Sequence, residues 1–240
     1  MTSTSATLTQ FAPAAASLFN NMKTPAAIIA GAMIPLGFAA PIPQTRDPKD
    51  TTFDFFLRRI SPFMAVAALG SELLSVMWAT VAVNQLTESK VKLAESVWHL
   101  LKRDFELEWA ATNAHFSIGM FLFMCVIGTR SYFIGGQGAL GKSACGLAMS
   151  ILLLMVSIVN RGVASGGGDG MRYGGNVLSL FRVYISHFLK RAFSTAGFGP
   201  LEIGAVGLLL VSTVGTINSI WSEISCGDLS RVEPSQGNTS

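Results

Sequence analysis

Four long stretches of the chain are apolar and almost free of charged residues, at about 62–86, 110–131, 143–159 and 200–221. A helix that crosses a membrane needs about 20 mostly apolar residues, because the hydrocarbon core is about 30 Å thick and a helix rises about 1.5 Å per residue. The stretches also lack the alternation of polar and apolar residues that marks the strands of a membrane β-barrel. The pattern predicts an all-α integral membrane protein with four transmembrane helices.

A fifth stretch without charge, Thr24–Ile42, is built largely of Ala, Gly and Pro. Pro35 near its middle favours a kink, because proline removes one helical hydrogen bond. We favour a fifth span here. A re-entrant or interfacial segment is one alternative, and a cleaved signal peptide with Gly37 and Ala39 as the small residues before the cut is another.

The first 23 residues contain no Asp or Glu and begin with a run rich in Ser and Thr. This composition is typical of an organellar transit segment and favours a plastid or mitochondrion, although transit segments are also rich in Arg and this one has only Lys23. A flexible polar terminus is the alternative. We expect residues 24–225 to form a single helical membrane domain, followed by a polar tail at 226–240.

The basic residues bear on the orientation of the chain. If Thr24–Ile42 spans the membrane, slightly more Lys and Arg lie on the N-terminal side than on the other. Because basic loops are enriched on the cytoplasmic side, we expect the N-terminus on the cytosolic, matrix or stromal side. If that stretch does not span, the count favours neither orientation.

The stretch at about 88–109 has no Pro or Gly and carries both acidic and basic residues. Its apolar residues recur every three or four positions, which predicts one amphipathic helix on the membrane surface or against the bundle. The members of this apolar stripe are Val91, Ala94, Trp98, Leu101 and Phe105. His99 lies one turn from Glu95 and one turn from Arg103, so we expect a solvated charge pair there and not a metal site.

A second amphipathic helix is predicted at about 176–193. Arg182 near its centre makes it a poor span, so we expect it to lie parallel to the membrane surface. Arg182, Lys190 and Arg191 would then contact anionic lipid headgroups, and docking onto a partner subunit is the alternative. The apolar face of this helix consists of Val177, Phe181, Tyr184, Ile185, Phe188 and Ala192.

The composition supports a membrane protein and excludes other classes. Half of the 240 residues are hydrophobic and only 13% are charged, whereas soluble domains carry about 25% charged residues. This argues against a disordered chain and against an ordinary soluble enzyme. The net charge of +3 is too small to indicate nucleic-acid binding. Cys125, Cys145 and Cys226 lie far apart, so neither a disulfide framework nor a zinc site is expected.

Two glycine-rich segments are predicted to be connections. Residues Gly136–Ser143 match the letters of the phosphate-binding loop G-x-x-x-x-G-K-[ST]. That loop functions between a buried strand and a helix, and apolar spans flank this copy, so we predict a tight turn with no nucleotide and with Lys142 reaching the lipid headgroups. Gly162–Gly175 contains seven glycines and predicts a flexible loop.

Four polar residues in or near the spans are candidates for functional roles. Glu72 is the one acidic residue well inside a predicted span, where an ionised side chain is costly. Arg130 is the better partner if the first span begins nearer Val66, because His115 should lie about 13 Å away in depth. A structural ion pair, a proton relay and a protonated hydrogen-bond donor are all open as roles for Glu72. Glu202 begins the last span, where a carboxylate favours the helix N-terminus, and it could also pair with His115.

The sequence favours a non-enzymatic membrane protein, an accessory or scaffolding subunit of a larger assembly. No catalytic set of Ser, Cys, His or paired carboxylates stands out, and the expected partners are the lipid bilayer and other membrane subunits. The alternative is a small transporter or channel in which Glu72 is the buried functional charge. The sequence identifies no cofactor, and bound pigment or lipid stays open.

Overall fold

The computed structural model describes residues 9–39, 42, 51–88, 91–136, 138–164, 176–192 and 199–229. Within these residues the regular structure is helical, apart from one isolated bridge between Thr9 and Ala94. Five helices are long and apolar enough to cross a membrane. The all-α class is therefore confirmed, and the five apolar helices are compatible with a membrane location.

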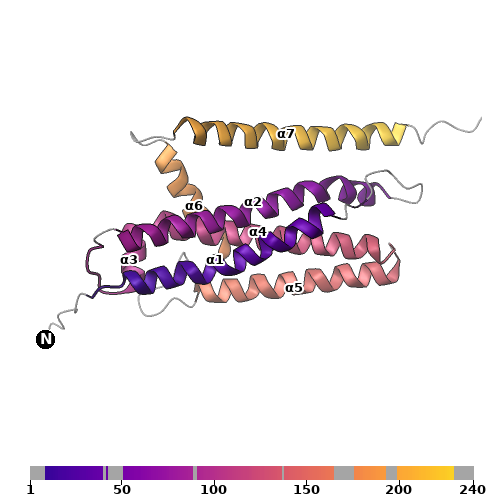
Figure 1. Ribbon diagram of the computed structural model, residues 1–240. Helices are drawn as coiled ribbons and strands as arrows, with labels where there is room; N and C mark the ends of the chain where they lie inside the picture. The colour runs from indigo at the N-terminus through magenta and orange to yellow at the C-terminus, as the bar shows by residue number, and fades with distance from the viewer. Residues whose placement is uncertain are drawn as a thin grey trace, which may run out of the picture.

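Four of the long helices lie side by side in alternating directions, and the fifth runs along their outer side (Figure 1). α3 and α6 lie at the end of the bundle where α2 finishes and α4 begins. The helices are α1 (Ala12–Ile34), which continues into the π-helix η1 (Pro35–Ala39), α2 (Thr52–Glu88), α3 (Val97–Asp104), α4 (Glu106–Ile134), α5 (Ala139–Ala164), α6 (Val177–Ala192) and α7 (Pro200–Leu229).

The fifth apolar stretch is helical, but its boundaries differ from the predicted ones. α1 begins at Ala12 with a proline in its first turn, so Lys23 lies inside the helix and not before it. Residues 12–23, which we assigned to a flexible or transit-like terminus, are therefore helical, and Ala15 and Phe19 are buried. Proline suits the first turn because the N–H that it lacks would have no partner there. Pro35 marks the change from α-helix to π-helix, which is the break that its missing N–H predicts.

α2 begins ten residues earlier than predicted, and Pro62 lies inside it. Its start is fixed by reciprocal hydrogen bonds between Thr51 and Asp54: the Thr51 N–H and hydroxyl both donate to Asp54 Oδ2, and the Asp54 N–H donates to Thr51 Oγ1. This is the arrangement of a capping box. With 37 residues, α2 measures about 55 Å and exceeds the thickness of a hydrocarbon core.

The prediction of one continuous helix at 88–109 is wrong. α2 ends at Glu88, and the described residues 91–96 before α3 are not helical. Ser96 ends the extended segment, because its hydroxyl accepts a hydrogen bond from the N–H of His99 and caps α3. Three residues of the predicted stripe, Ala94, Leu101 and Phe105, are buried in a cluster with α1 and α2, although they do not share one helix.

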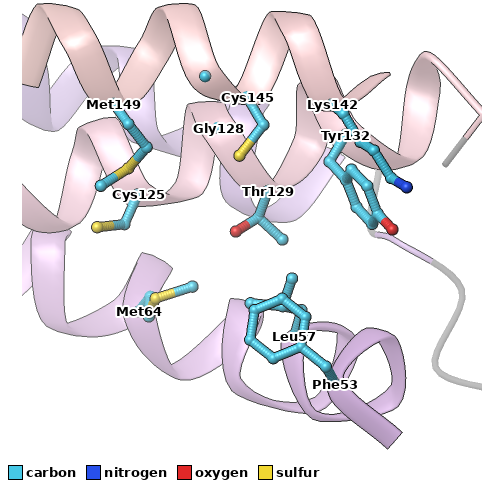
Figure 2. Close-up of a pocket in the computed structure, with 11 residues that line it drawn as sticks. Phe53, Leu57, Met64, Cys125, Gly128, Thr129, Tyr132, Lys142, Cys145 and Met149 are labelled. Carbon is cyan, nitrogen blue, oxygen red and sulfur yellow. The ribbon is translucent and has the colours of Figure 1, made fainter. Parts of the chain in front are cut away.

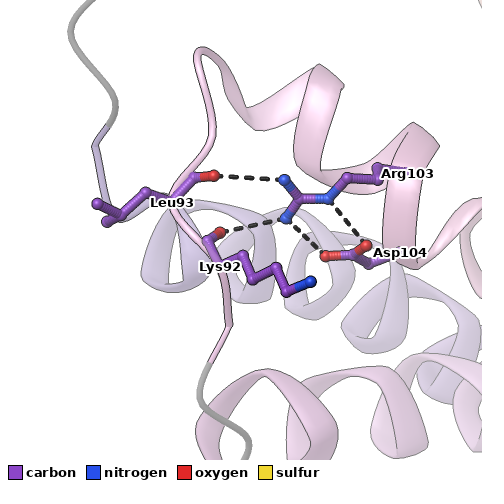
Figure 3. A network of polar contacts seen from close by, with 4 residues as sticks. All are labelled: Lys92, Leu93, Arg103 and Asp104. Carbon is purple, nitrogen blue, oxygen red and sulfur yellow. Dashed lines mark hydrogen bonds and ion pairs between the residues drawn. The ribbon is translucent and has the colours of Figure 1, made fainter.

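Arg103 holds the extended segment against α3 (Figure 3). Its guanidinium donates to the carbonyl oxygens of Lys92 and Leu93 at 3.2 and 3.3 Å, and it pairs with Asp104 at 2.7 Å. The hydrogen bond from Arg103 lowers the pKa of the Asp104 carboxyl. The pair is therefore present at neutral pH and is lost as the pH falls through that lowered pKa.

α6 packs along α4 and also contacts α5. Leu180 is fully buried, whereas Ile185, which we assigned to the apolar face, is 53% exposed. The packed face is therefore rotated toward Leu180 and Tyr184, because Tyr184 reaches His115 of α4. A position parallel to the membrane surface stays a prediction, and residue 193, the predicted end of this helix, lies outside the described residues.

Small side chains form the contact between the two central helices. α2 and α4 pack along most of their length, and α1 contacts both. Small residues allow two helix backbones to approach closely, which is how helices associate where lipid removes the hydrophobic drive. Ala65 and Ala68 of α2 cluster with Val126 of α4 and Met33 of α1, and Ala79 and Ala82 of α2 cluster with α1 and α3. On α4 the buried alanines are Ala110, Ala111 and Ala114.

A tight turn joins α4 to α5, as predicted for the phosphate-loop letters. The element before this segment is the helix α4 and not a strand. Gly136 has a positive φ of +78°. A Cβ on Gly135 would lie 2.7 Å from the Gly141 Cα, and a Cβ on Gly141 would lie 2.5 Å from the Tyr132 carbonyl oxygen. These glycines are explained by the close approach of two helices. Of the second glycine-rich segment, 165–175 lies outside the described residues, and α5 includes Gly162.

Gly141→Ala is expected to lower the stability by about 1–3 kcal/mol, the usual cost of overpacking. The added methyl group would meet backbone, which cannot move away as a long side chain can. Gly146→Ala in the same helix is the control, since a Cβ there meets nothing within 4 Å. Thermal unfolding in detergent, followed by circular dichroism, compares the two, and equal unfolding temperatures would contradict this account.

Candidate functional site

Glu72 lies in the middle of α2 and is completely buried. It is among the largest side chains enclosed in the structure. Neither of its carboxylate oxygens has a hydrogen-bond partner within the described residues. Because burial of an unpaired carboxylate is costly, Glu72 is the residue of the core that packing alone does not explain.

Gly119 of α4 makes the room for this carboxyl group. A Cβ on Gly119 would lie 2.5 Å from Glu72 Oε1 and 2.7 Å from Glu72 Cγ. Any larger residue at position 119 would therefore force α2 and α4 apart or displace the glutamate. The side chain and the glycine form one packing unit.

Polar groups lie one or two helical turns from Gly119 on α4. Ser75 of α2 donates a hydrogen bond of 3.0 Å to the carbonyl oxygen of Thr112, and both side chains are buried. His115, one turn before Gly119, contacts the Tyr184 hydroxyl through Nε2 at 3.0 Å. Its Nδ1 is buried without a hydrogen-bond partner among the described residues. These groups can accept, donate and exchange protons.

A second contact fixes α6 to the start of α4. His187 Nε2 lies 3.1 Å from the carboxylate of Glu106, and both side chains are about 30% exposed (29% and 28%). Together with the His115–Tyr184 hydrogen bond, it holds α6 against the N-terminal half of α4. Sequence reasoning placed neither Tyr184 nor His187 in this role.

The predicted pair of Glu72 and Arg130 is not formed. Arg130 donates instead to the carbonyl oxygen of Leu36, near the end of the helical segment that α1 begins. It lies eleven residues, or about 16 Å, beyond Gly119 along α4. The error came from the predicted helix boundaries, because α2 extends far beyond Pro62 toward the N-terminus.

The predicted pair of Glu202 and His115 is not supported either. Among the described residues, α7 contacts α2 but not α4, and His115 faces α6. The side chain of Glu202 lies outside the described residues, and its backbone is in the first turn of α7 as predicted.

The basic side chains that were predicted to contact lipid headgroups are exposed. Lys142 lies at the start of α5, at the end of the bundle where α4 finishes. Arg182, Lys190 and Arg191 lie on α6, whose later part adjoins the beginning of α4. Lys142 and the cations of α6 therefore belong to opposite halves of the bundle, and their contact with lipid stays a prediction.

Sequence reasoning missed a polar cluster at the end of the bundle that contains Lys142. Tyr132 of α4 donates a hydrogen bond of 2.8 Å to Asp54 Oδ1, which ties the end of α4 to the start of α2. The guanidinium of Arg58 lies over the Phe133 ring, 4.2 Å from its centroid. The Thr51–Asp54 capping-box pattern was the signal that could have located this cluster.

The described residues hold no group of three or more His, Cys, Asp or Glu side chains that could bind a metal ion. Comparison of the chain with protein-family models, with curated proteins and with solved structures finds no match in any of the three. The function is therefore argued from the geometry alone.

Gly119→Ala is expected to lower the stability by about 1–3 kcal/mol, because the added methyl group meets the Glu72 carboxyl. The loss should depend on the glutamate. Glu72→Ala, Gly119→Ala and the double variant, compared by thermal unfolding in detergent, form a double-mutant cycle. The double variant should be no less stable than Glu72→Ala alone.

Gly70→Ala is the matched control for this cycle. Gly70 also lies in the interior of α2, and a Cβ there meets nothing within 4 Å. Alanine is favoured over glycine in helices by about 1 kcal/mol, so this variant should be neutral or more stable. Additive losses for Glu72 and Gly119 would show that the two residues do not pack as a unit.

Proposed function

We propose that this chain is a non-enzymatic integral membrane protein, an accessory or scaffolding subunit that packs against other membrane subunits and lipid. Five long apolar helices support the membrane placement. The Ser- and Thr-rich, acid-free start of the chain supports an organellar membrane, of a plastid or mitochondrion. The observation that carries the subunit role is the state of α7.

α7 is the least enclosed of the five long helices. Of its described side chains only Ile220 is buried, and α2 is its one contacting helix within the described residues. Between α7 and α2 lies a gap of about 410 Å³, toward which α7 presents small residues. The α7 residues that line it are Ser212, Gly215, Thr216, Ser219 and Ile220, opposite Arg59 and Phe63 of α2.

This arrangement supports the attachment of another protein at α7. Small and hydroxylated residues are the surfaces through which membrane helices associate, because they allow close packing and interhelical hydrogen bonds. Here that surface lines a gap and is not packed against α2. Side chains of a helix from a partner subunit would enter the gap and cover residues that this chain leaves open.

Native gel electrophoresis of the tagged chain from mildly solubilised host membranes tests this role. The wild-type chain should migrate in a complex with another protein, well above its own 25.5 kDa. Gly215→Leu should shift it toward the monomer, since the new side chain would occupy the gap. Gly207→Leu is the control, because a Cβ at Gly207 meets nothing within 4 Å and the residue does not line the gap. A monomeric wild-type chain, or equal effects of both variants, would contradict the proposal.

One observation favours a second function, the transport of protons or a small cation. Glu72 is buried in the core without a hydrogen-bond partner, and ionisable residues inside membranes often belong to ion pathways. Ser75 lies one turn from Glu72 on α2, and Thr112 and His115 lie within two turns of Gly119, which faces Glu72 from α4. In this proposal Glu72 binds and releases the transported ion.

Glu72→Gln in reconstituted vesicles tests transport, with an internal pH-sensitive dye as the readout of proton flux. The variant keeps the shape of the side chain and removes its charge, so it should abolish the flux while the circular dichroism spectrum stays unchanged. Glu88→Gln is the control, since Glu88 lies exposed at the end of α2. Absence of flux in the wild-type vesicles, or unchanged flux in the Glu72 variant, would exclude this role for Glu72.

A further inference from the structure

An apolar cavity of about 650 Å³ lies between α2, α4 and α5 (Figure 2). This volume is within the range of about 300–1,000 Å³ that is usual for sites of small molecules. Phe53, Leu57 and Met64 of α2 form one wall, and Cys145, Gly146 and Met149 of α5 form the other. α4 forms the floor between them.

The cavity exists because α2 and α5 both pack on α4 without touching each other. Within the described residues α4 contacts α2 and α5 closely, and no contact joins α2 to α5. Glycines at positions 128 and 146 keep the hollow open, and a Cβ on Gly146 would meet nothing within 4 Å. An empty space of this size forfeits van der Waals contacts along its walls, so in a bilayer it would be filled.

The length of the cavity matches one leaflet of a bilayer. Its lining extends from Lys142 to Met149 on α5 and from Tyr132 to Cys125 on α4, which is about 10 Å along each helix. On α2 it extends from Phe53 to Met64, which is about 16 Å along the helix. Half of a hydrocarbon core of about 30 Å is comparable. The cavity runs along the helices, and its length suits an extended acyl chain of one leaflet.

The chemistry of the cavity changes along its length. Figure 2 places Met149 and Cys125 at one end and Tyr132 and Lys142 at the other. The Tyr132 hydroxyl is already engaged, because it donates to Asp54. Lys142 is exposed and has no carboxylate partner among the described residues. The mouth of an otherwise apolar cavity thus carries an available positive charge.

The described arginines near this end of the bundle are engaged within the protein, and the Arg59 guanidinium lies 5.4 Å from the centroid of the Phe55 ring. Arg130 donates to the carbonyl oxygen of Leu36, and Arg58 stacks on Phe133. Lys142 therefore stands apart from them as the cation at the cavity mouth. A ligand that complements this site has one long apolar part and one anionic end.

We propose that the cavity binds an acyl chain of an anionic phospholipid from the surrounding bilayer, with the headgroup phosphate beside Lys142. The proposal relies on the membrane placement but not on the subunit role or on transport. Lys142 supplies the preference for an anionic headgroup. The apolar walls and Gly146 supply the room for the chain.

Native mass spectrometry of the full-length protein tests this site. The protein is equilibrated with equal amounts of dioleoyl phosphatidylglycerol and dioleoyl phosphatidylcholine in mixed micelles, and the retained lipids are counted. The wild-type chain should retain several-fold more phosphatidylglycerol than phosphatidylcholine. Lys142→Gln should bring that ratio close to one, whereas Lys102→Gln, a change of an exposed lysine on α3, should leave it unchanged.

A second pair of variants tests the chain-binding part. Gly146→Leu should lower the retention of both lipids several-fold, because its side chain fills the cavity without displacing backbone. Gly204→Leu on α7 is the control, since a Cβ there also meets nothing within 4 Å and the residue lies outside the cavity. Equal retention of the two lipids by the wild-type chain, or unchanged retention by Gly146→Leu, would overturn the proposal. The proposal would also be overturned if the wild-type chain were a dimer, and Gly146→Leu converted it to a monomer without changing lipid retention. That result would mean that a second copy of the chain occupies the cavity.

Discussion

The close contact between α2 and α4 is the constraint on which the rest of the structure depends. α1 packs on both of these helices, α5 and α6 pack on α4, and α7 touches α2. In a membrane, where lipid is as apolar as the side chains, close packing and not a hydrophobic drive would hold these helices together. The small residues of the contact, Gly119 among them, therefore determine how near the central helices come and where every other helix can lie.

Glu72 lies inside that contact and opposes it energetically. Its carboxyl is enclosed without a hydrogen-bond partner among the described residues, whereas an apolar side chain of similar volume would fill the same space without the cost of desolvation. Gly119 removes the steric conflict but not the electrostatic one. A carboxyl at this position does not stabilise the fold. Among the core residues, Glu72 is therefore the strongest candidate for a chemical role.

The sequence predicted the long apolar helices well, because about 20 uncharged residues in a row have few alternatives to a membrane helix. The predictions failed where local capping hydrogen bonds determine at which residue a helix begins. The capping box of Thr51 and Asp54 starts α2 ten residues before Pro62, and Ser96 divides the stretch that periodicity alone read as one helix. The partners of Glu72 were predicted from depth along the helices, and each error in a helix end became an error in depth. Gly119 could not be foreseen, because a glycine in an apolar span gives no sign of which neighbour it faces.

The five long helices also divide into a tight group and a loose one, and the spaces between the two groups differ in chemistry. α1, α2 and α4 contain most of the buried alanines, while α5 and α7 are mostly exposed. An apolar helix that is little buried can have either lipid or protein as its neighbour. The side chains that line the cavity beside α5 and the gap beside α7 indicate which of the two suits each space. The cavity beside α5 is apolar with a lysine at its mouth, which complements a lipid. On its α7 side the gap beside α7 is lined mainly with hydroxyls and glycine, which suits a helix that approaches closely and offers hydrogen-bond partners. The difference in lining is the reason for proposing a lipid at one space and a protein at the other.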